Sequence, residues 1–269
     1  MFGAIIGDIV GSVYEWDNIK TKNFPFFRKD CHFTDDSVMT IAVADAIMNG
    51  GLRDNFIDSM KKFGRAYPAA GYGSHFKKWL FESDREPYGS FGNGSAMRVS
   101  PCAWASPLDL EKGFKKSQTL ARLSADVTHN HSEGIKGALA TNDAIFLARY
   151  YSRKIELHEL KQKIKNHIES EYGYDLNFTL DEIRPFYKFS ATCQETVPQA
   201  IESFLESTDF EDAIRNAISI GGDSDTIGAI AGSIAEAAYG IPDEIKQKAC
   251  QFLDAPLKEV IFKFAEFIK

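Results

Sequence analysis

The sequence has few cysteines, and the four that it has lie far apart, at Cys31, Cys102, Cys193 and Cys250. No Cys-x-x-Cys pair occurs, which argues against a zinc site and against a disulfide framework. We therefore expect reduced thiols and a cytoplasmic protein.

Long hydrophobic runs and basic runs are also missing. No apolar stretch approaches the ~20 residues that span a bilayer, and the first residues lack the basic start of a signal peptide. The chain carries 31 Lys+Arg against 38 Asp+Glu, a net charge of -7, and such a field repels nucleic-acid backbones and anionic membranes. These absences disfavour a membrane protein and a nucleic-acid-binding protein.

Period-two alternation is scarce, while apolar residues recur at three- and four-residue steps, so the sequence predicts an all-α protein. We expect helices over residues 3–14, 37–48, 108–124, 132–151, 154–171, 196–207 and 210–220, and one more after the GGDSDT motif. The segments 67–107 and 173–194 have little periodicity and are expected to be loops, the second of them a lobe or lid. No linker is visible, which favours a single domain over residues 1–269. We also expect a monomer.

Small residues mark two helices for close packing. Gly3, Gly7 and Gly11 share one helix face, where another backbone can approach. The helix after Gly221-Gly222 has glycine or alanine at positions 228, 231, 232 and 235. If these helices approach their neighbours closely, acidic residues at the helix starts can meet.

Two acidic clusters, Thr34-Asp35-Asp36 and Asp223-Ser224-Asp225-Thr226, lie at helix starts. Capping explains either cluster alone. Adjacent carboxylates, however, repel one another unless a cation lies between them. Oxygen ligands from both clusters would select Mg²⁺, Mn²⁺ or Ca²⁺, and about four carboxylates favour a pair of metals. The candidate ligands are Thr34, Asp35, Asp36, Asp223, Asp225 and Thr226.

Three further features are candidates for the same site. Glu15 is another carboxylate, although a lone glutamate is usually a surface charge. In the loop FGNGSAMR, glycines let backbone N–H groups converge on an anion, and Ser95 and Arg98 add polar groups, unless the loop is an ordinary turn. His129 and His131 lack a third nitrogen or sulfur ligand nearby, so a loop or ligand-contacting role is favoured over metal binding.

These motifs together resemble the ADP-ribosylglycohydrolase family. The segments that carry the resemblance are MFGAIIGDIVGSVYE, FTDDSVMT, GNGSAMR, VTHNHSEGIKGA, TVPQAI and GGDSDTIGAIAGSIAEAAYGIP, in this order, from residue 3 to about residue 242. The Thr-Asp-Asp-Ser motif and the Gly-Gly-Asp-x-Asp-Thr motif are specific as a pair, and neither is persuasive alone.

The resemblance implies a compact orthogonal helical bundle with two Mg²⁺ or Mn²⁺ ions in a cleft and an ADP-ribosylated substrate. It assigns the six candidate ligands above to the metals and places Glu15 beside the scissile bond. Whether Glu15 or Asp36 handles the proton stays open. The substrate-binding residues implied by the motifs are Asn93, Gly94, Ser95, Met97, Arg98, His129, Gly221 and Gly222.

The implied activity is hydrolysis of the bond between the distal ribose of ADP-ribose and an acceptor, with a protein arginine side chain as the first expectation. Serine, a nucleic-acid base or a small molecule would use the same chemistry. Two other readings are a non-catalytic ADP-ribose-binding or structural relative and a Mg²⁺-dependent helical isoprenoid synthase. The spacing of Asp35-Asp36 disfavours the synthase, and the number of converging carboxylates disfavours the non-catalytic relative.

Overall fold

Two small-residue helices, α1 (Phe2–Gly11) and α13 (Ser224–Tyr239), pack face to face inside the molecule. The computed structural model describes residues 1–269. A Cβ built on Gly7 would lie 2.0 Å from the carbonyl oxygen of Gly228, and one on Gly11 would lie 2.5 Å from the Cα of Asp225. The predicted close approach of backbones is confirmed, and only glycine permits it at these positions.

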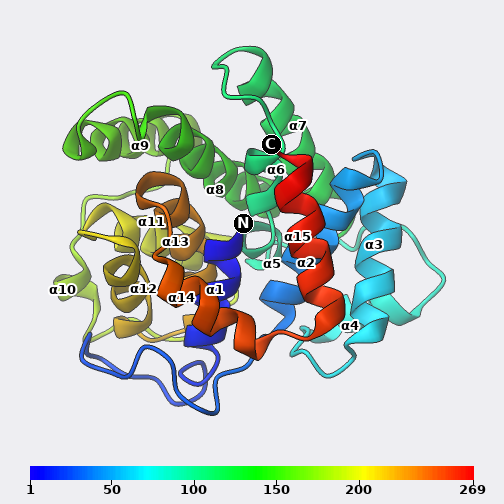
Figure 1. The fold of residues 1–269 in the computed structure, drawn as a ribbon, viewed down its shortest axis with the longest axis horizontal. Helices are drawn as coiled ribbons and strands as arrows, with labels where there is room; N and C mark the ends of the chain where they lie inside the picture. The colour runs from blue at the N-terminus through cyan, green and yellow to red at the C-terminus, as the bar shows by residue number, and fades with distance from the viewer.

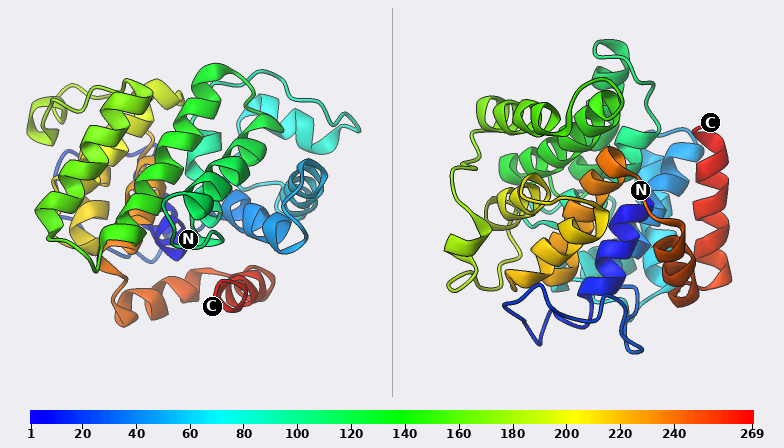
Figure 2. Two further views of the ribbon diagram at one scale, coloured as in Figure 1. Left: turned by 90° about the horizontal axis from the view of Figure 1, so that it is seen from above. Right: turned by 60° about the vertical axis from the view of Figure 1, so that its left-hand side comes forward.

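The other helices surround this pair, and no strand is present beyond one isolated bridge between Gly92 and Thr192 (Figures 1 and 2). The all-α prediction is therefore confirmed. The bounds are α2 (Asp35–Met48), α3 (Arg53–Ala66), α4 (Ser74–Phe81), α5 (Gly94–Met97), α6 (Ser100–Trp104), α7 (Lys112–Asp126), α8 (Ser132–Tyr151), α9 (Leu157–Tyr172), α10 (Leu180–Ile183), α11 (Cys193–Leu205), α12 (Phe210–Ser219), α14 (Asp243–Ala249), the 3₁₀ helix η1 (Cys250–Phe252) and α15 (Ala255–Phe267).

Helix α13 is central to the bundle, because it contacts α12, α11 and α8 as well as α1. Almost every residue of α13 is buried, down to the polar side chains of Ser224, Asp225 and Thr226 in its first turn. Helices α14 and α15 return along the outside of α1 and α2 (Figure 2). The first turns of α2 and α13 therefore lie deep in the protein, on either side of the last turn of α1.

The expectation of loop throughout residues 67–107 was wrong, because α4, α5 and α6 lie there. Helices of four to eight residues are too short to display a hydrophobic period. The loop expected over residues 173–194 is confirmed up to residue 192 except for the four residues of α10, and its last two residues already belong to α11. Residues 53–66, 243–252 and 255–267 are helical as well, where no helix was predicted.

Candidate active site

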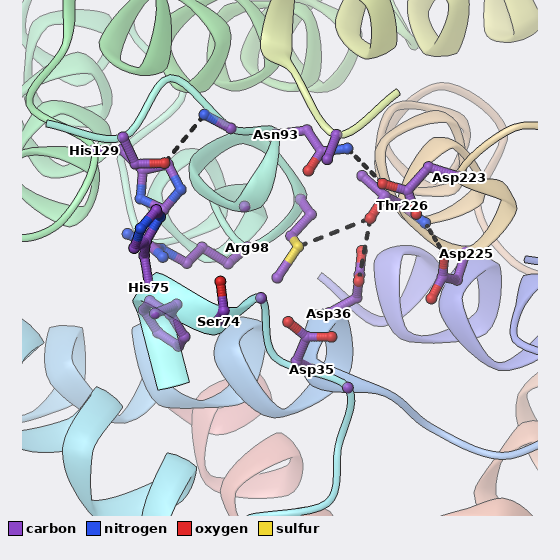
Figure 3. A pocket seen from close by; sticks show the side chains of 18 of the residues that line it. Asp35, Asp36, Ser74, His75, Asn93, Arg98, His129, Asp223, Asp225 and Thr226 are labelled. Carbon is purple, nitrogen blue, oxygen red and sulfur yellow. Dashed lines mark hydrogen bonds between the residues drawn. The ribbon is translucent and has the colours of Figure 1, made fainter. Parts of the chain in front are cut away.

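A cavity of about 400 Å³ opens between the first turns of α2 and α13, the loop before α5 and the start of α4 (Figure 3). One end is acidic and the other carries rings, with His75 and His129 among them. The carboxylates that line it belong to Glu15, Asp35, Asp36, Asp223 and Asp225. The sequence-predicted clusters are thus brought together, although they lie almost 190 residues apart.

The first turn of α2 is held by a buried aspartate of α1 that the sequence analysis did not single out. Asp8 is fully buried and accepts hydrogen bonds from the backbone N–H groups of Thr34 and Ser37, at 2.9 and 3.0 Å. It also accepts from the hydroxyl groups of both residues, at 2.7 Å for Thr34. Asp8 therefore fixes the turn that presents Asp35 and Asp36. Asp8 is the one charged residue in an otherwise apolar, glycine-containing helix, and that position could have marked it as a functional residue in the sequence.

Several oxygens converge between α2 and α13. The Thr34 hydroxyl donates its single proton to Asp8, yet it lies only 3.4 Å from carboxylate oxygens of Asp36 and Asp225. The Thr226 hydroxyl lies 3.3 Å from Asp36 Oδ2. Asp36 Oδ1 is buried and has no hydrogen-bond partner. Oxygens with free lone pairs in such proximity are the arrangement that a cation stabilises.

Burial and mutual repulsion raise the pKa values of these carboxyl groups. Desolvation is the largest cause for Asp35, Asp36 and Asp225, and neighbouring carboxylates add to it, so all three pKa values lie well above the ordinary value. For Asp223, burial raises the pKa to about 6, partly opposed by hydrogen bonds from its neighbours. No lysine lines the cavity to pair with this charge, and Arg98 is the only arginine.

The donor set fits divalent cations. Two groups of three carboxylates each place one oxygen per residue within 4.8 Å of the others: Asp8, Asp36 and Asp225, and Glu15, Asp223 and Asp225. Asp225 belongs to both groups. Because Asp8 already accepts four hydrogen bonds, its oxygens are committed to the α2 turn, while the unpartnered oxygen of Asp36 remains available. The all-oxygen chemistry suits Mg²⁺ or Mn²⁺.

Glu15 lies at the edge of the acidic end rather than on the open surface. Burial and the Asp225 carboxylate raise the pKa of Glu15 to about 7, against the lowering effect of the Trp16 side chain. The backbone at Glu15 is tied to the second cluster by Asn18. Its Nδ2 donates to the carbonyl oxygens of Glu15, Tyr14 and Gly222, at 2.9, 2.6 and 3.0 Å, and its Oδ1 accepts from Gly222 N–H at 2.8 Å.

The loop before α5 reaches the acidic end through Asn93. Its Nδ2 donates to Asp223 Oδ2 at 2.7 Å and to the Thr196 hydroxyl at 3.1 Å. Gly94 and Met97 line the cavity beside it. The Ser95 side chain is fully buried and donates to the Gly134 carbonyl at 2.7 Å, so it does not line the cavity.

A hydrogen-bonded chain fixes His129 at the other end. Arg98 is buried, and its Nη2 donates to the Ser124 carbonyl and to the Thr128 hydroxyl at 2.7 and 2.9 Å. Since the Thr128 hydroxyl accepts from Arg98, its proton is free to go to His129 Nδ1, 2.7 Å away. That assignment leaves the proton of a neutral imidazole on Nε2, which lies beside Gly94. Burial lowers the pKa of His129 well below its ordinary value, so the ring is neutral at pH 7.

Two predicted groups lie elsewhere. Gly221 and Gly222 adopt positive φ angles of 71° and 78° and face Asn18, Lys20 and Tyr187 rather than the cavity. His131 caps α8, since its Nδ1 accepts from Glu133 N–H at 3.2 Å. Gly221 and Gly222 therefore act on the site only through the backbone that leads to Asp223.

Comparison with known proteins relates this chain to one family. The family model for ADP-ribosylglycohydrolase matches residues 1–267. ADP-ribosylhydrolase ARH3 of Homo sapiens is 31% identical, over 93% of this chain and 87% of that protein. ADP-ribosylarginine hydrolase Tri1 of Pseudomonas putida is 25% identical, over 90% of this chain and 70% of that protein.

A solved structure, described as an ADP-ribosylglycohydrolase-related protein complex, superposes with a TM-score of 0.66 at 21% identity, covering 99% of this chain and 94% of that one. At this identity the superposition establishes the fold alone.

None of the helices here combines the length and apolar composition that a bilayer crossing requires. From the family match, the chain belongs to the ADP-ribosylglycohydrolase family.

Proposed function

We propose that this chain is a metal-dependent ADP-ribosylhydrolase that cleaves the bond between the distal ribose and an acceptor, with a protein arginine side chain as the acceptor. The observation that carries the proposal is the cavity itself. Five carboxylates line one end of it, and the other end carries the Asn93–Gly94 loop and the neutral His129. A substrate with a diphosphate and two riboses would extend from the ring-lined end to the acidic end.

Two Mg²⁺ or Mn²⁺ ions would be held by Thr34, Asp35, Asp36, Asp223, Asp225 and Thr226. When bound, the ions supply positive charge that offsets the carboxylates and polarises the ribose hydroxyl groups. Asp225 is central to this assignment because it belongs to both carboxylate groups. The unpartnered Oδ1 of Asp36 supports a ligand role for that residue.

ADP-ribose binding is assigned to the middle and the ring-lined end of the cavity. Glycine backbone at Gly92 and Gly94 allows the diphosphate to approach N–H groups closely. His129 offers Nε2–H as a donor there, and Arg98 retains an Nε–H without a partner. Asn93 connects this part to the acidic end, since its side chain holds Asp223.

Glu15 is the residue that we assign to proton transfer. Hydrolysis breaks the bond from ribose C1 to the acceptor, adds water oxygen to C1 and leaves a proton on the departing acceptor, through a state with positive charge on the ribose. Glu15 lies beside Asp223 and Asp225 at the edge of the acidic end, and a carboxyl group there can give or accept this proton; in the metal-free chain its pKa is raised to about 7. Asp36 is more enclosed, and we assign it to the metals instead.

Arginine as the acceptor is supported by the similarity to Tri1, which is an ADP-ribosylarginine hydrolase. The test is a panel of arginine-linked, serine-linked and base-linked ADP-ribose substrates, assayed with Mg²⁺, with Mn²⁺ and with EDTA. We expect metal-dependent release of ADP-ribose from the arginine-linked substrate. Binding of ADP-ribose without hydrolysis of any substrate would instead identify a non-catalytic member of the family.

A further inference from the structure

Two exposed aromatic side chains meet at the acidic end of the cavity, although they come from loops more than 170 residues apart. Trp16 is 80% exposed and Phe189 is 46% exposed. Their rings are stacked, with centroids 5.3 Å apart and planes inclined by 21°. Both line the cavity. Because Trp16 is 80% exposed, much of its indole surface is free beyond the side that faces Phe189.

The pair lies beside the proposed reaction centre. Trp16 directly follows Glu15, whose carboxylate is within 4.8 Å of those of Asp223 and Asp225. The ring-lined end, with His129 and Arg98, lies on the opposite side of the cavity (Figure 3). If the diphosphate occupies that end and the scissile bond lies at Glu15, the group beyond the bond must pass Trp16 and Phe189. That group is the acceptor.

We propose that Trp16 and Phe189 form an acceptor subsite whose aromatic face stacks on the planar, cationic guanidinium of ADP-ribosylated arginine; this inference rests on the proposed function. The face of an indole ring attracts a cation, and arginine is the cation that stacks best because its group is flat and weakly hydrated. Arg98, at the ring-lined end, is the only lysine or arginine of the lining (Figure 3).

Other acceptors would use this surface less well. A serine-linked acceptor presents a short O-glycosidic link with neither a plane nor a charge, so it gains little from an indole. A nucleobase would stack but would gain no cation–π attraction. The arginine-linked substrate is therefore the one whose turnover should depend most on Trp16.

The test compares Trp16→Ala, Trp16→Phe and Phe189→Ala with the wild type on arginine-linked, serine-linked and base-linked substrates. We expect Trp16→Ala to lower kcat/KM for the arginine-linked substrate by about tenfold, in keeping with a cation–π contact. The serine-linked substrate and the Kd of free ADP-ribose should change less than about twofold. Trp16→Phe should keep most of the activity, because a ring remains.

Phe186→Ala is the matched control. Phe186 belongs to the same loop and is 79% exposed, but it does not line the cavity, so its loss should leave all substrates unaffected. An equal loss on every substrate in Trp16→Ala would overturn the subsite and indicate that Trp16 acts through Glu15. A selective loss on the base-linked substrate would overturn the guanidinium assignment.

A binding measurement separates this inference from the proposed function. In Glu15→Gln, titration with an arginine-linked ADP-ribosyl peptide should change the tryptophan fluorescence, and the change should vanish when Trp16→Phe is added. Free ADP-ribose should not produce it. If the wild type hydrolyses nothing while this signal is present, the hydrolase proposal fails and the subsite stands. An identical response to both ligands would overturn the subsite.

Discussion

The carboxylates at the acidic end predict opposite effects of pH on the stability of the metal-free and metal-bound protein. Burial raises the pKa of Asp223 from 3.8 to about 6. The folded chain therefore binds this proton more tightly than the unfolded chain does, and stability falls as the pH rises from about 4 to about 6. A shift of this size costs about 3 kcal/mol once the group is ionised. The raised pKa values of Asp35, Asp36 and Asp225 act in the same direction.

Metal binding should reverse this dependence. Cations bind the ionised groups of the folded chain, and a concentration 1,000 times the Kd stabilises it by about 4.1 kcal/mol. For a protein of this size, that corresponds to a rise in Tm of about 8–16 °C. Melts followed by circular dichroism from pH 4.5 to 8, in EDTA and in Mg²⁺ or Mn²⁺, measure both effects. We expect the difference between the two conditions to grow with pH.

Asp223→Asn provides the decisive variant. Asparagine keeps an oxygen that accepts from Asn93 but carries no charge, so in EDTA the variant should be more stable than the wild type at pH 8 and no more stable at pH 4.5. It should also respond less to metal. Asp243→Asn, at a side chain 88% exposed on α14, is the matched control and should behave as the wild type. An Asp223→Asn protein that is less stable than the wild type at pH 8 in EDTA would refute the reasoning.

Three further predictions follow from the geometry. Glu15→Gln should bind ADP-ribose almost normally in calorimetry while turnover falls by about 10²-fold or more; equal losses in binding and rate would mean that Glu15 positions the ligand instead. Asn18→Ala should lower kcat by about tenfold with a smaller change in KM, because the backbone at Glu15 loses its anchor; an unchanged kcat would contradict this role. Gly11→Ala and Gly3→Ala should both lower the Tm, since each Cβ would clash with α13, but only Gly11→Ala should weaken metal binding in titration calorimetry, because its Cβ meets Asp225 Cα at 2.5 Å. Equal metal affinity in the two glycine variants would contradict the expected effect of Gly11→Ala on metal binding.

The sequence was informative about the packing that builds the acidic end. Glycines at four-residue spacing predict a helix face that admits another backbone. The structure confirms this prediction, because Gly7 lies against the backbone of Gly228. The Thr34 cap was also predictable from residue type, and its hydroxyl accepts from Asp36 N–H. Both inferences depend on residues near one another in sequence or on a periodic pattern.

Contacts between distant loops were not predictable in this way. The stack of Trp16 on Phe189 joins two irregular segments, and no period or spacing relates them. Asn18 reaches Gly222 across 204 residues, and it resembles any other turn asparagine in the sequence. Loop side chains are placed by the packing of the helices that carry the loops, so their partners follow only from the assembled fold.

Helix α1 sets the distance between α2 and α13, and its Asp8 also binds the first turn of α2. One of its faces has glycines at positions 7 and 11, which let α13 approach until backbones touch. Between them in sequence, Asp8 points to α2 and accepts four hydrogen bonds from its first turn. The distance between Asp36 and Asp225 is therefore set by α1 rather than by any contact between the two aspartates, which repel one another. A helix of this kind can hold like charges together in the absence of metal, because the packing energy of two helix interfaces opposes the repulsion.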